Sequence, residues 1–357
     1  MTLSKWRTGF RGLLAALALS LGMPGASLAE TIVATWNIRN LGWENGKDFA
    51  ELARIAERFD LFAVQEVMSE RGIQDLVVAL ETSSGLKWQY LVSHATGRGT
   101  YKEHYAFVFR EGKVEWVDGA VVYIDDRDVF EREPFAARFR TYDGIEFVMT
   151  SVHLIYGQTV EGRQREAGAL SAYREWLDRM FPGTPVFVAG DFNLPPSDDA
   201  WEHLGRRAWP LIQVGGTTLG MQNGKYANLY DNIWAPSGID LPVSGYGVLD
   251  YPKEVLGWSH EHARERISDH APVWMILDAD APPIRFQPWT SEVAQVAMPG
   301  IDPIADTPVI ANRNSGIYHL PSCPGYSTVS ARNRIDYADP EDAEVHGYRR
   351  AKNCPVF

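Results

Sequence analysis

The chain has 357 residues, of which 45% are hydrophobic and 12% aromatic, so it can bury a large core and is not an intrinsically disordered protein. Its 46 acidic and 34 basic residues give a formal net charge of −12, which excludes nucleic-acid binding through a general excess of positive charge. Any contact with a polyanion must therefore depend on local basic side chains or on a bound cation.

The first 29 residues have the order of a secretory signal peptide. A basic start precedes an apolar run over residues 13–23 that is too short to cross a bilayer. Ser27 and Ala29 are small residues of the kind that a signal peptidase reads, so we expect cleavage after Ala29. The agreement of these features disfavours the alternative of a buried N-terminal helix. We therefore expect a secreted or periplasmic protein that keeps no membrane anchor.

Strand-like and helix-like segments alternate from residue 31 to residue 278. Apolar and β-branched runs predict strands at 31–38, 61–67, 88–93, 104–110, 114–123, 135–142, 145–153, 186–189, 228–234 and 271–277. Apolar residues at helical spacing predict helices over 48–59, 72–82 and 161–180. Strands outnumber helices and tight turns join several of them, so we expect an α/β sandwich of mixed sheets with helices outside, not a doubly wound parallel sheet.

The character of the sequence changes after this region. Residues 281–308 contain six prolines, a density that neither a helix nor a central strand tolerates. We therefore predict one large domain over residues 30–280, an extended Pro-rich linker over 281–308, and a small C-terminal module over 309–357.

Polar residues suited to phosphate-ester chemistry lie where the predicted strands begin or end. They are Asn37, Glu66, His153, Asp191, Asn193, Asp231, Asn232, Asp269 and His270. Carboxylates and amides are ligands for a hard cation such as Mg²⁺, and imidazoles serve as general acids and bases. Each residue alone has an ordinary explanation, such as a solvated strand end for Glu66 or an Asx turn for Asp191. Their ordered series at strand ends predicts a shared cleft.

These ordered motifs resemble the endonuclease/exonuclease/phosphatase superfamily, and the DNase I type most closely within it. The matching stretches are residues 35–39, 64–67, 101–110, 151–153, 190–193, 230–233 and 268–270. The resemblance covers nearly all of residues 31–278. It implies a four-layer fold, with two packed mixed β-sheets flanked by helices, and a metal-dependent phosphodiesterase that acts on DNA.

The resemblance implies the acid–base chemistry residue by residue. His153 and His270 would be the paired general acid and base, with Glu103 behind His153 and Asp231 behind His270. A carboxylate behind an imidazole fixes its tautomer and raises the basicity of the far nitrogen. We therefore expect two imidazole–carboxylate pairs in one cleft.

The same resemblance implies a metal site and a phosphate site. Glu66, Asn37 and Asp269 would hold the metal, with Mg²⁺ as the expected ion and Mn²⁺ or Ca²⁺ as alternatives. Asp191 and Asn193 would bind the scissile phosphate or position water. These residues complete the catalytic set that the motifs predict.

The resemblance also implies contacts to DNA. Arg39 and Tyr101 resemble groups that touch DNA along the minor groove, and Thr218 would contact a phosphate. One departure concerns Met68, because DNase I carries an arginine at this position that enters the minor groove. Arg71 lies a few residues further along, so the departure puts the groove contact in doubt and leaves the chemistry untouched.

The C-terminal module resembles the metal-binding module of Ada-type DNA-repair proteins, which holds zinc with four cysteines. The positions that match its ligands are His319, Cys323, Ala351 and Cys354. Because Ala351 is not a ligand and the expected compartment is oxidising, we favour a Cys323–Cys354 disulfide over a Zn²⁺ site. Such a bond would close a loop of roughly 30 residues and stabilise the module by about 3–4 kcal/mol.

The sequence therefore predicts a secreted, monomeric, metal-dependent endonuclease that hydrolyses the phosphodiester bonds of DNA, with RNA as a further possible substrate. One alternative is a phospholipid or inositol-phosphate phosphodiesterase of the sphingomyelinase kind, for which Trp201, Trp209 and Trp258 would offer exposed aromatic loops. Another alternative is a catalytically silent DNA-binding or toxin-like protein. The complete set of acids and imidazoles argues against the silent protein.

Overall fold

A computed structural model describes residues 30–157, 159–222, 224–290, 293, 309–320, 323, 325–337, 340, 343 and 346–351. The predicted signal peptide, residues 1–29, lies outside this part of the chain. Among the residues that are described, no helix has both the length and the apolar character needed to span a membrane.

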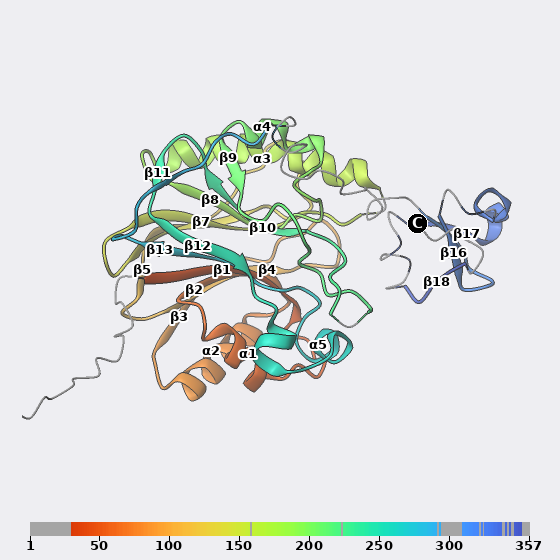
Figure 1. The fold of residues 1–357 in the computed structure, drawn as a ribbon, viewed down its shortest axis with the longest axis horizontal. Coiled ribbons are helices and arrows are strands. Elements are labelled where there is room, and N and C mark those ends of the chain that lie inside the picture. The colour runs from red at the N-terminus through yellow and green to blue at the C-terminus, as the bar shows by residue number, and fades with distance from the viewer. Residues whose placement is uncertain are drawn as a thin grey trace, which may run out of the picture.

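Two six-stranded sheets pack against each other and form the body of the molecule (Figure 1). The first sheet has the order β12 (Val243–Val248), β13 (Val273–Asp278), β1 (Glu30–Leu41), β2 (Leu61–Val67), β4 (His104–Arg110) and β3 (Trp88–Val92). The second has the order β5 (Val114–Val122), β6 (Phe135–Thr141), β7 (Glu146–His153), β8 (Val186–Asp191), β10 (Asp231–Pro236) and β9 (Ala208–Pro210). In each sheet one pair is parallel, β1 with β2 and β7 with β8, and the other pairs are antiparallel. The predicted mixed sheets are confirmed.

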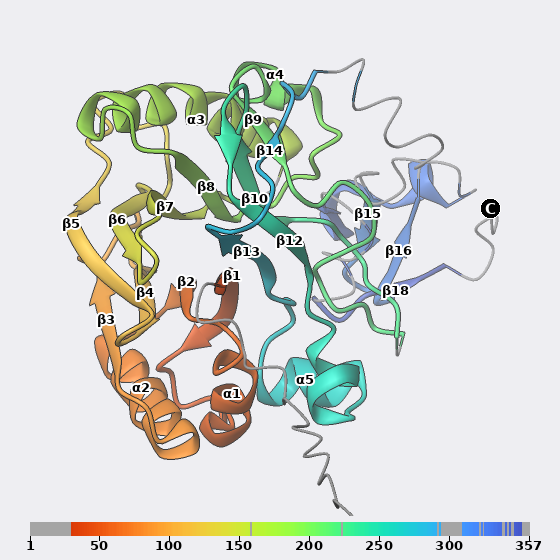
Figure 2. The same ribbon diagram turned by 60° about the vertical axis from the view of Figure 1, so that its left-hand side comes forward.

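Helices cover the outer faces of both sheets, as Figures 1 and 2 show from two directions. On the first sheet lie α1 (Phe49–Ala56), α2 (Glu70–Ser84), α5 (His260–Arg266) and the π-helical turn η2 (Pro252–Leu256). On the second lie α3 (Val160–Met180), the short η1 (Asp199–Trp201) and α4 (Glu202–Gly205). Helix, sheet, sheet and helix make the four predicted layers.

Three apolar clusters hold these layers together. Between the sheets, residues such as Phe107, Phe139 and Met149 are fully buried. A second cluster joins the first sheet to α1 and α2, and a third joins the second sheet to α3 through Leu170 and Leu177. Burial of this apolar area is the main favourable contribution to folding.

The helix boundaries follow local capping. Ser69 accepts a hydrogen bond from the Gly72 N–H and begins α2, and Gly85, with φ 68°, ends it. Asp48 caps α1 by accepting from the Glu51 N–H. The helix predicted over residues 48–59 ends earlier, at Ala56, because the chain then turns into β2.

The packed body continues beyond the predicted domain boundary at residue 280. Within the segment assigned to the linker, β14 (Ile284–Arg285) pairs with β11 (Asp240–Leu241). Trp289 is 2% exposed, and its N–H donates to the Gly205 carbonyl at 2.7 Å while Nε1–H donates to the Pro196 carbonyl at 2.9 Å. In the described part of this segment, Phe286 and Trp289 both pack on Trp209 and attach the chain to the body.

The C-terminal module has its own four-stranded sheet and small core. The strand order is β17 (Arg334–Tyr337), β15 (Val309–Asn312), β16 (Ile317–His319) and β18 (Arg349–Arg350). Cys323 is buried, but Cys354 lies outside the described residues, so their disulfide remains a prediction. Within the described part of the chain, His319 and Cys323 do not belong to a cluster of three or more candidate metal ligands.

Gly190 sets the spacing between β7 and β8. Their parallel register pairs Val152 with Gly190 and His153 with Asp191. Gly190 has φ 148°, and a Cβ atom there would lie 2.0 Å from the Val152 carbonyl oxygen. Only glycine permits this approach, which brings His153 next to Asp191.

Replacing Gly190 with alanine should lower the free energy of unfolding by about 2–5 kcal/mol, since it adds both a steric overlap and backbone strain. Urea denaturation measures this change. Gly168→Ala is the matched control, because Gly168 lies in α3 with open space around it, and it should be neutral or slightly stabilising. Equal stability of the two variants would contradict this explanation.

Candidate active site

One cavity of about 240 Å³ lies where strand ends from both sheets meet, and we call it the strand-end cavity. It is lined by Glu66, His153, Tyr156, Asp191, Asn193, Thr218, Asn228, Tyr230, Asp269, His270 and His346. The structure thus brings together seven residues whose sequence motifs predicted metal, phosphate or acid–base roles. Asn37, Glu103 and Asp231 contact members of this set from behind.

His153 is backed by a buried carboxylate. Its Nδ1 donates to Glu103 Oε2 at 2.9 Å, and Glu103 Oε1 lies 3.0 Å from Arg132 Nε. Burial alone would raise the pKa of Glu103, but the charges of His153 and Arg132 together with hydrogen bonds hold it below its usual range. Burial and Arg132 lower the pKa of His153, and the Glu103 carboxylate outweighs them and raises it.

His270 is backed in the same way from the second sheet. Its Nδ1 donates to Asp231 Oδ2 at 2.8 Å, and Asp231 is fully buried at the start of β10. Burial lowers the pKa of His270, but the carboxylates of Asp231 and Asp191 raise it well above the ordinary value. Both imidazoles are therefore fixed in one tautomer, with Nε2 directed away from the supporting carboxylate.

Asp191 lies between the two rings. Its Oδ2 is 3.6 Å from His153 Nε2 and 3.8 Å from His270 Nε2, and it accepts a hydrogen bond from Asn37 Nδ2 at 2.9 Å. Its Oδ1 accepts from the Asn193 N–H at 3.0 Å. Two imidazoles that face one carboxylate can protonate or deprotonate a group bound between them.

Glu66 reaches the cavity through an irregularity in β2. Its φ is 56°, and the register between β2 and β4 shifts between Val64 and Val67, as in a β-bulge. Oε1 accepts from Asn37 Nδ2 at 3.0 Å, and Oε2 accepts from the Asn40 N–H at 2.9 Å. The bulge directs the Glu66 side chain toward the cavity. Because φ is positive at a residue other than glycine, the backbone at this predicted strand end is strained.

The side chains of the cavity suit a hard divalent cation. Glu66, Asp191 and Asp269 supply carboxylate oxygens, and ligand atoms of Asp191, Asp231 and His270 all lie within 4.8 Å of one another. Burial raises the pKa of Asp269, but nearby His270 and two arginines lower it below the usual value, so this carboxylate is ionised. Carboxylate oxygens on more than one side of the cavity are suitable ligands for Mg²⁺, Mn²⁺ or Ca²⁺, the ions that the resemblance implied.

The predicted DNA-contact residues differ in their exposure. Tyr101 is 43% exposed, and its hydroxyl donates to Asn40 Oδ1 at 3.3 Å and lies 3.7 Å from Met68 Sδ. Arg39 is also accessible and pairs with Asp269. Thr218 is buried inside the cavity, where its Oγ1 accepts from the Asn228 N–H at 2.7 Å. Two of the three residues thus lie at the surface.

Two residues of the site, Arg132 and His346, were not predicted from the sequence. Arg132 is buried, and besides Glu103 it contacts the carbonyls of His153 at 3.1 Å and Leu154 at 2.9 Å. It lies in an irregular charged loop whose sequence gives no periodic signal. His346 comes from the C-terminal module, packs on Tyr337 and lines the strand-end cavity, and no local pattern links it to residues so distant in the chain.

The family model described as Endonuclease/Exonuclease/phosphatase family matches residues 34–270. The chain belongs to the endonuclease/exonuclease/phosphatase family. It is 45% identical over 278 residues to a deoxyribonuclease of Thioalkalivibrio sp. (strain K90mix), which covers 76% of this chain and 77% of that protein. It is 29% identical over 294 residues to deoxyribonuclease-1 of Bos taurus, covering 76% and 99%.

Solved structures agree with this family in their fold. An endonuclease/exonuclease/phosphatase from Bacteroides vulgatus superposes with a TM-score of 0.51 at 20% identity, covering 70% of this chain and 98% of the other. A mannosyl-6-phosphatase of Bacteroides thetaiotaomicron superposes with a TM-score of 0.50 at 18% identity, covering 69% and 98%. These similarities show the fold alone, so the substrate must be argued from the site and the sequence relatives.

Replacing Glu103 with glutamine should lower the pKa of His153, because Asp191 alone would then oppose the effects of burial and Arg132. Titration of the His153 imidazole by NMR measures the change. Glu81→Gln removes a partly exposed carboxylate on α2 that pairs with Lys87, and it should leave that titration unchanged. An unaltered His153 pKa in Glu103→Gln would show that the carboxylate does not control the ring.

The same pair should also give a pH-dependent stability. Since the pKa of His153 is raised in the folded state, its contribution is fully present below the unfolded value, about 6.5, and is lost as the pH rises through the folded value. Unfolding free energies measured by urea denaturation across this range should therefore fall with pH in the wild type. They should fall less steeply in Glu103→Gln, and identical slopes would contradict the prediction.

Proposed function

We propose that this protein is a secreted endonuclease that hydrolyses the phosphodiester bonds of DNA with the help of a divalent cation, Mg²⁺ above all. The observation that carries the proposal is the pair of carboxylate-backed imidazoles whose Nε2 atoms both face Asp191. Sequence relatives named deoxyribonuclease support DNA as the substrate. The motifs lie in the part of the chain that matches the family model.

The proposed reaction uses the two imidazoles as partners. One ring, neutral at Nε2, accepts a proton from the attacking water, and the other, protonated at Nε2, donates a proton to the leaving oxygen. Glu103 and Asp231 hold the rings and stabilise the charged form of each. By analogy with the family, the product would carry a 5′-phosphate.

Asn37, Glu66 and Asp269 complete the proposed site. When bound, the cation would neutralise negative charge on the phosphate oxygens. Asn37 fixes its neighbours, because its amide Nδ2 donates to both Glu66 and Asp191. The carboxylates of Glu66 and Asp269 would hold the cation, and Asn193 and Asp191 would orient the phosphate or the water.

The structure gives little support to a lipid phosphodiesterase. Trp201 is 1% exposed in the core under α3, so it does not form the exposed aromatic loop that this alternative would use. Trp209 and Trp258 are partly buried and pack against the apolar clusters. These side chains stabilise the body and do not form an apolar loop for membranes.

The extracellular setting and the C-terminal disulfide belong to the same proposal. Cys323 is buried in the module, and its Sγ accepts a hydrogen bond from the Leu320 N–H at 2.9 Å. Cys354 is the only other cysteine of the sequence. A disulfide between them fits a secreted protein better than a zinc site with one ligand replaced by Ala351.

Replacing His153, His270 or Glu66 with alanine should each reduce Mg²⁺-dependent plasmid nicking by about 10²–10⁴-fold, the usual effect of losing an acid–base group or charge stabilisation. His203→Ala is the matched control, since His203 is exposed on α4, and it should nick like the wild type. EDTA should abolish nicking. Wild-type rates in all three cavity variants, or hydrolysis of sphingomyelin vesicles without DNA nicking, would refute the proposal.

A further inference from the structure

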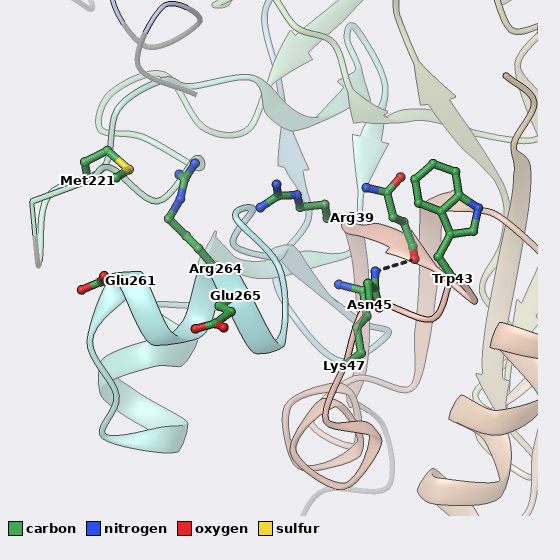
Figure 3. A pocket seen from close by; sticks show the side chains of 9 residues that line it. Arg39, Trp43, Asn45, Lys47, Met221, Glu261, Arg264 and Glu265 are labelled. Carbon is green, nitrogen blue, oxygen red and sulfur yellow. Dashed lines mark hydrogen bonds between the residues drawn. The ribbon is translucent and has the colours of Figure 1, made fainter. Parts of the chain in front are cut away.

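A second and larger cavity, of about 640 Å³, lies beside the strand-end cavity, between the end of β1 and helix α5 (Figure 3). It is lined by Arg39, Asn40, Trp43, Asn45, Lys47, Met221, Glu261, Arg264 and Glu265. We call it the α5 cavity. Its volume is within the usual range for ligand sites. Apart from Arg39, Asn40 and Arg264, which contact Glu66 or Asp269, its residues have no hydrogen bond or ion pair with the carboxylates and imidazoles described above.

The α5 cavity shares a wall with the strand-end cavity. Asp269 lines the strand-end cavity, and its Oδ2 lies 3.5 Å from Arg39 Nη1 and 3.6 Å from Arg264 Nη2. In Figure 3, Arg39 and Arg264 enter from different elements and carry their guanidinium groups to the same side of the cavity. A ligand in the α5 cavity would therefore bind directly next to the phosphate that is cleaved.

The lining of the α5 cavity favours an anion. Lys47 is a third cation, and its Nζ donates to the Ile267 carbonyl. Burial lowers the pKa of Lys47 to about 8, so it still carries its charge at neutral pH. Glu261 and Glu265 are exposed on α5, where water screens their charge. Arg39, Arg264 and the partly buried ammonium group of Lys47 are three cations that could bind a phosphate.

An aromatic side chain stands at the edge of the same cavity. Trp43 is 51% exposed and meets Tyr101 edge-on, with ring centroids 6.0 Å apart and an interplanar angle of 90°. An exposed indole face beside cations is a common platform for a nucleotide base, because every base can stack on it.

We propose that the α5 cavity binds the nucleotide next to the scissile phosphate, with Arg39, Lys47 and Arg264 around its phosphate and Trp43 against its base. The inference rests on the proposed cleavage of DNA, and it adds a binding site for the nucleotide that flanks the cleaved bond. It also explains how a protein with a negative net charge can bind a polyanion through a local group of basic side chains. Contact to the flanking nucleotide would add binding energy without changing the chemistry at Asp191.

The test compares a DNA substrate with a small diester that lacks flanking nucleotides, bis(4-nitrophenyl) phosphate. Lys47→Met should lower kcat/KM on an oligonucleotide by about tenfold, mainly through KM. In a plot of the logarithm of the binding constant against the logarithm of the salt concentration, the slope should become smaller in magnitude by about one. Trp43→Ala should lower kcat/KM on the oligonucleotide with the salt dependence unchanged. Neither variant should alter hydrolysis of the small diester.

Lys113→Met is the matched control, because Lys113 donates to the Glu30 carbonyl at the opposite end of β1 and should behave like the wild type. Circular dichroism melts show whether each variant is folded. Equal losses on both substrates would assign Lys47 to the structure of the cleavage site and overturn the proposal. Unchanged oligonucleotide kinetics in both variants would overturn it as well.

Binding separates this inference from the proposed function. A labelled oligonucleotide is titrated with protein in EDTA, and fluorescence anisotropy reports binding without cleavage. Weaker binding by Lys47→Met and Trp43→Ala than by the wild type would support the α5 cavity even if the wild type cut no DNA. Equal binding by wild type and both variants would overturn the inference even if the wild type cut DNA efficiently.

Discussion

The structure depends on the placement of one carboxylate, Asp191, between two imidazoles. Its Oδ2 lies within 4 Å of both His153 and His270 Nε2, at 3.6 and 3.8 Å, and the rings cannot turn away because Glu103 and Asp231 hold their Nδ1 atoms. Buried charges of this kind persist only when each is paired. Loss of one partner would leave a buried charge unpaired, so these contacts should stabilise the fold as well as orient the rings.

Both sheets are needed to build this arrangement. The second sheet brings His153, Asp191 and Asp231 together through β7, β8 and β10, and the register of β7 with β8 depends on the missing side chain of Gly190. The first sheet supplies Glu66 through a bulge in β2. The apolar layer between the sheets fixes their separation, so the distance across the cavity is a property of the core.

Much of this could be predicted from the sequence, because it is encoded locally. β2 and β4 begin and end as predicted, since each is a compact apolar run between polar residues. α5 and β12 were not predicted: α5 is short and mostly charged, and β12 is an edge strand interrupted by two glycines. Arg132 and Lys47 could not be assigned a role, because their partners come from distant parts of the chain.

The shared cavity is tested most directly by recording the NMR signals of the histidine side chains while Mn²⁺ is added. If the two rings face one cation-binding cavity, paramagnetic broadening should remove the His153 and His270 resonances together, at the same low Mn²⁺ concentration. The signals of the exposed His94 and His203 should persist. Sharp His153 and His270 signals at saturating Mn²⁺, or broadening of only one of them, would contradict a shared cavity.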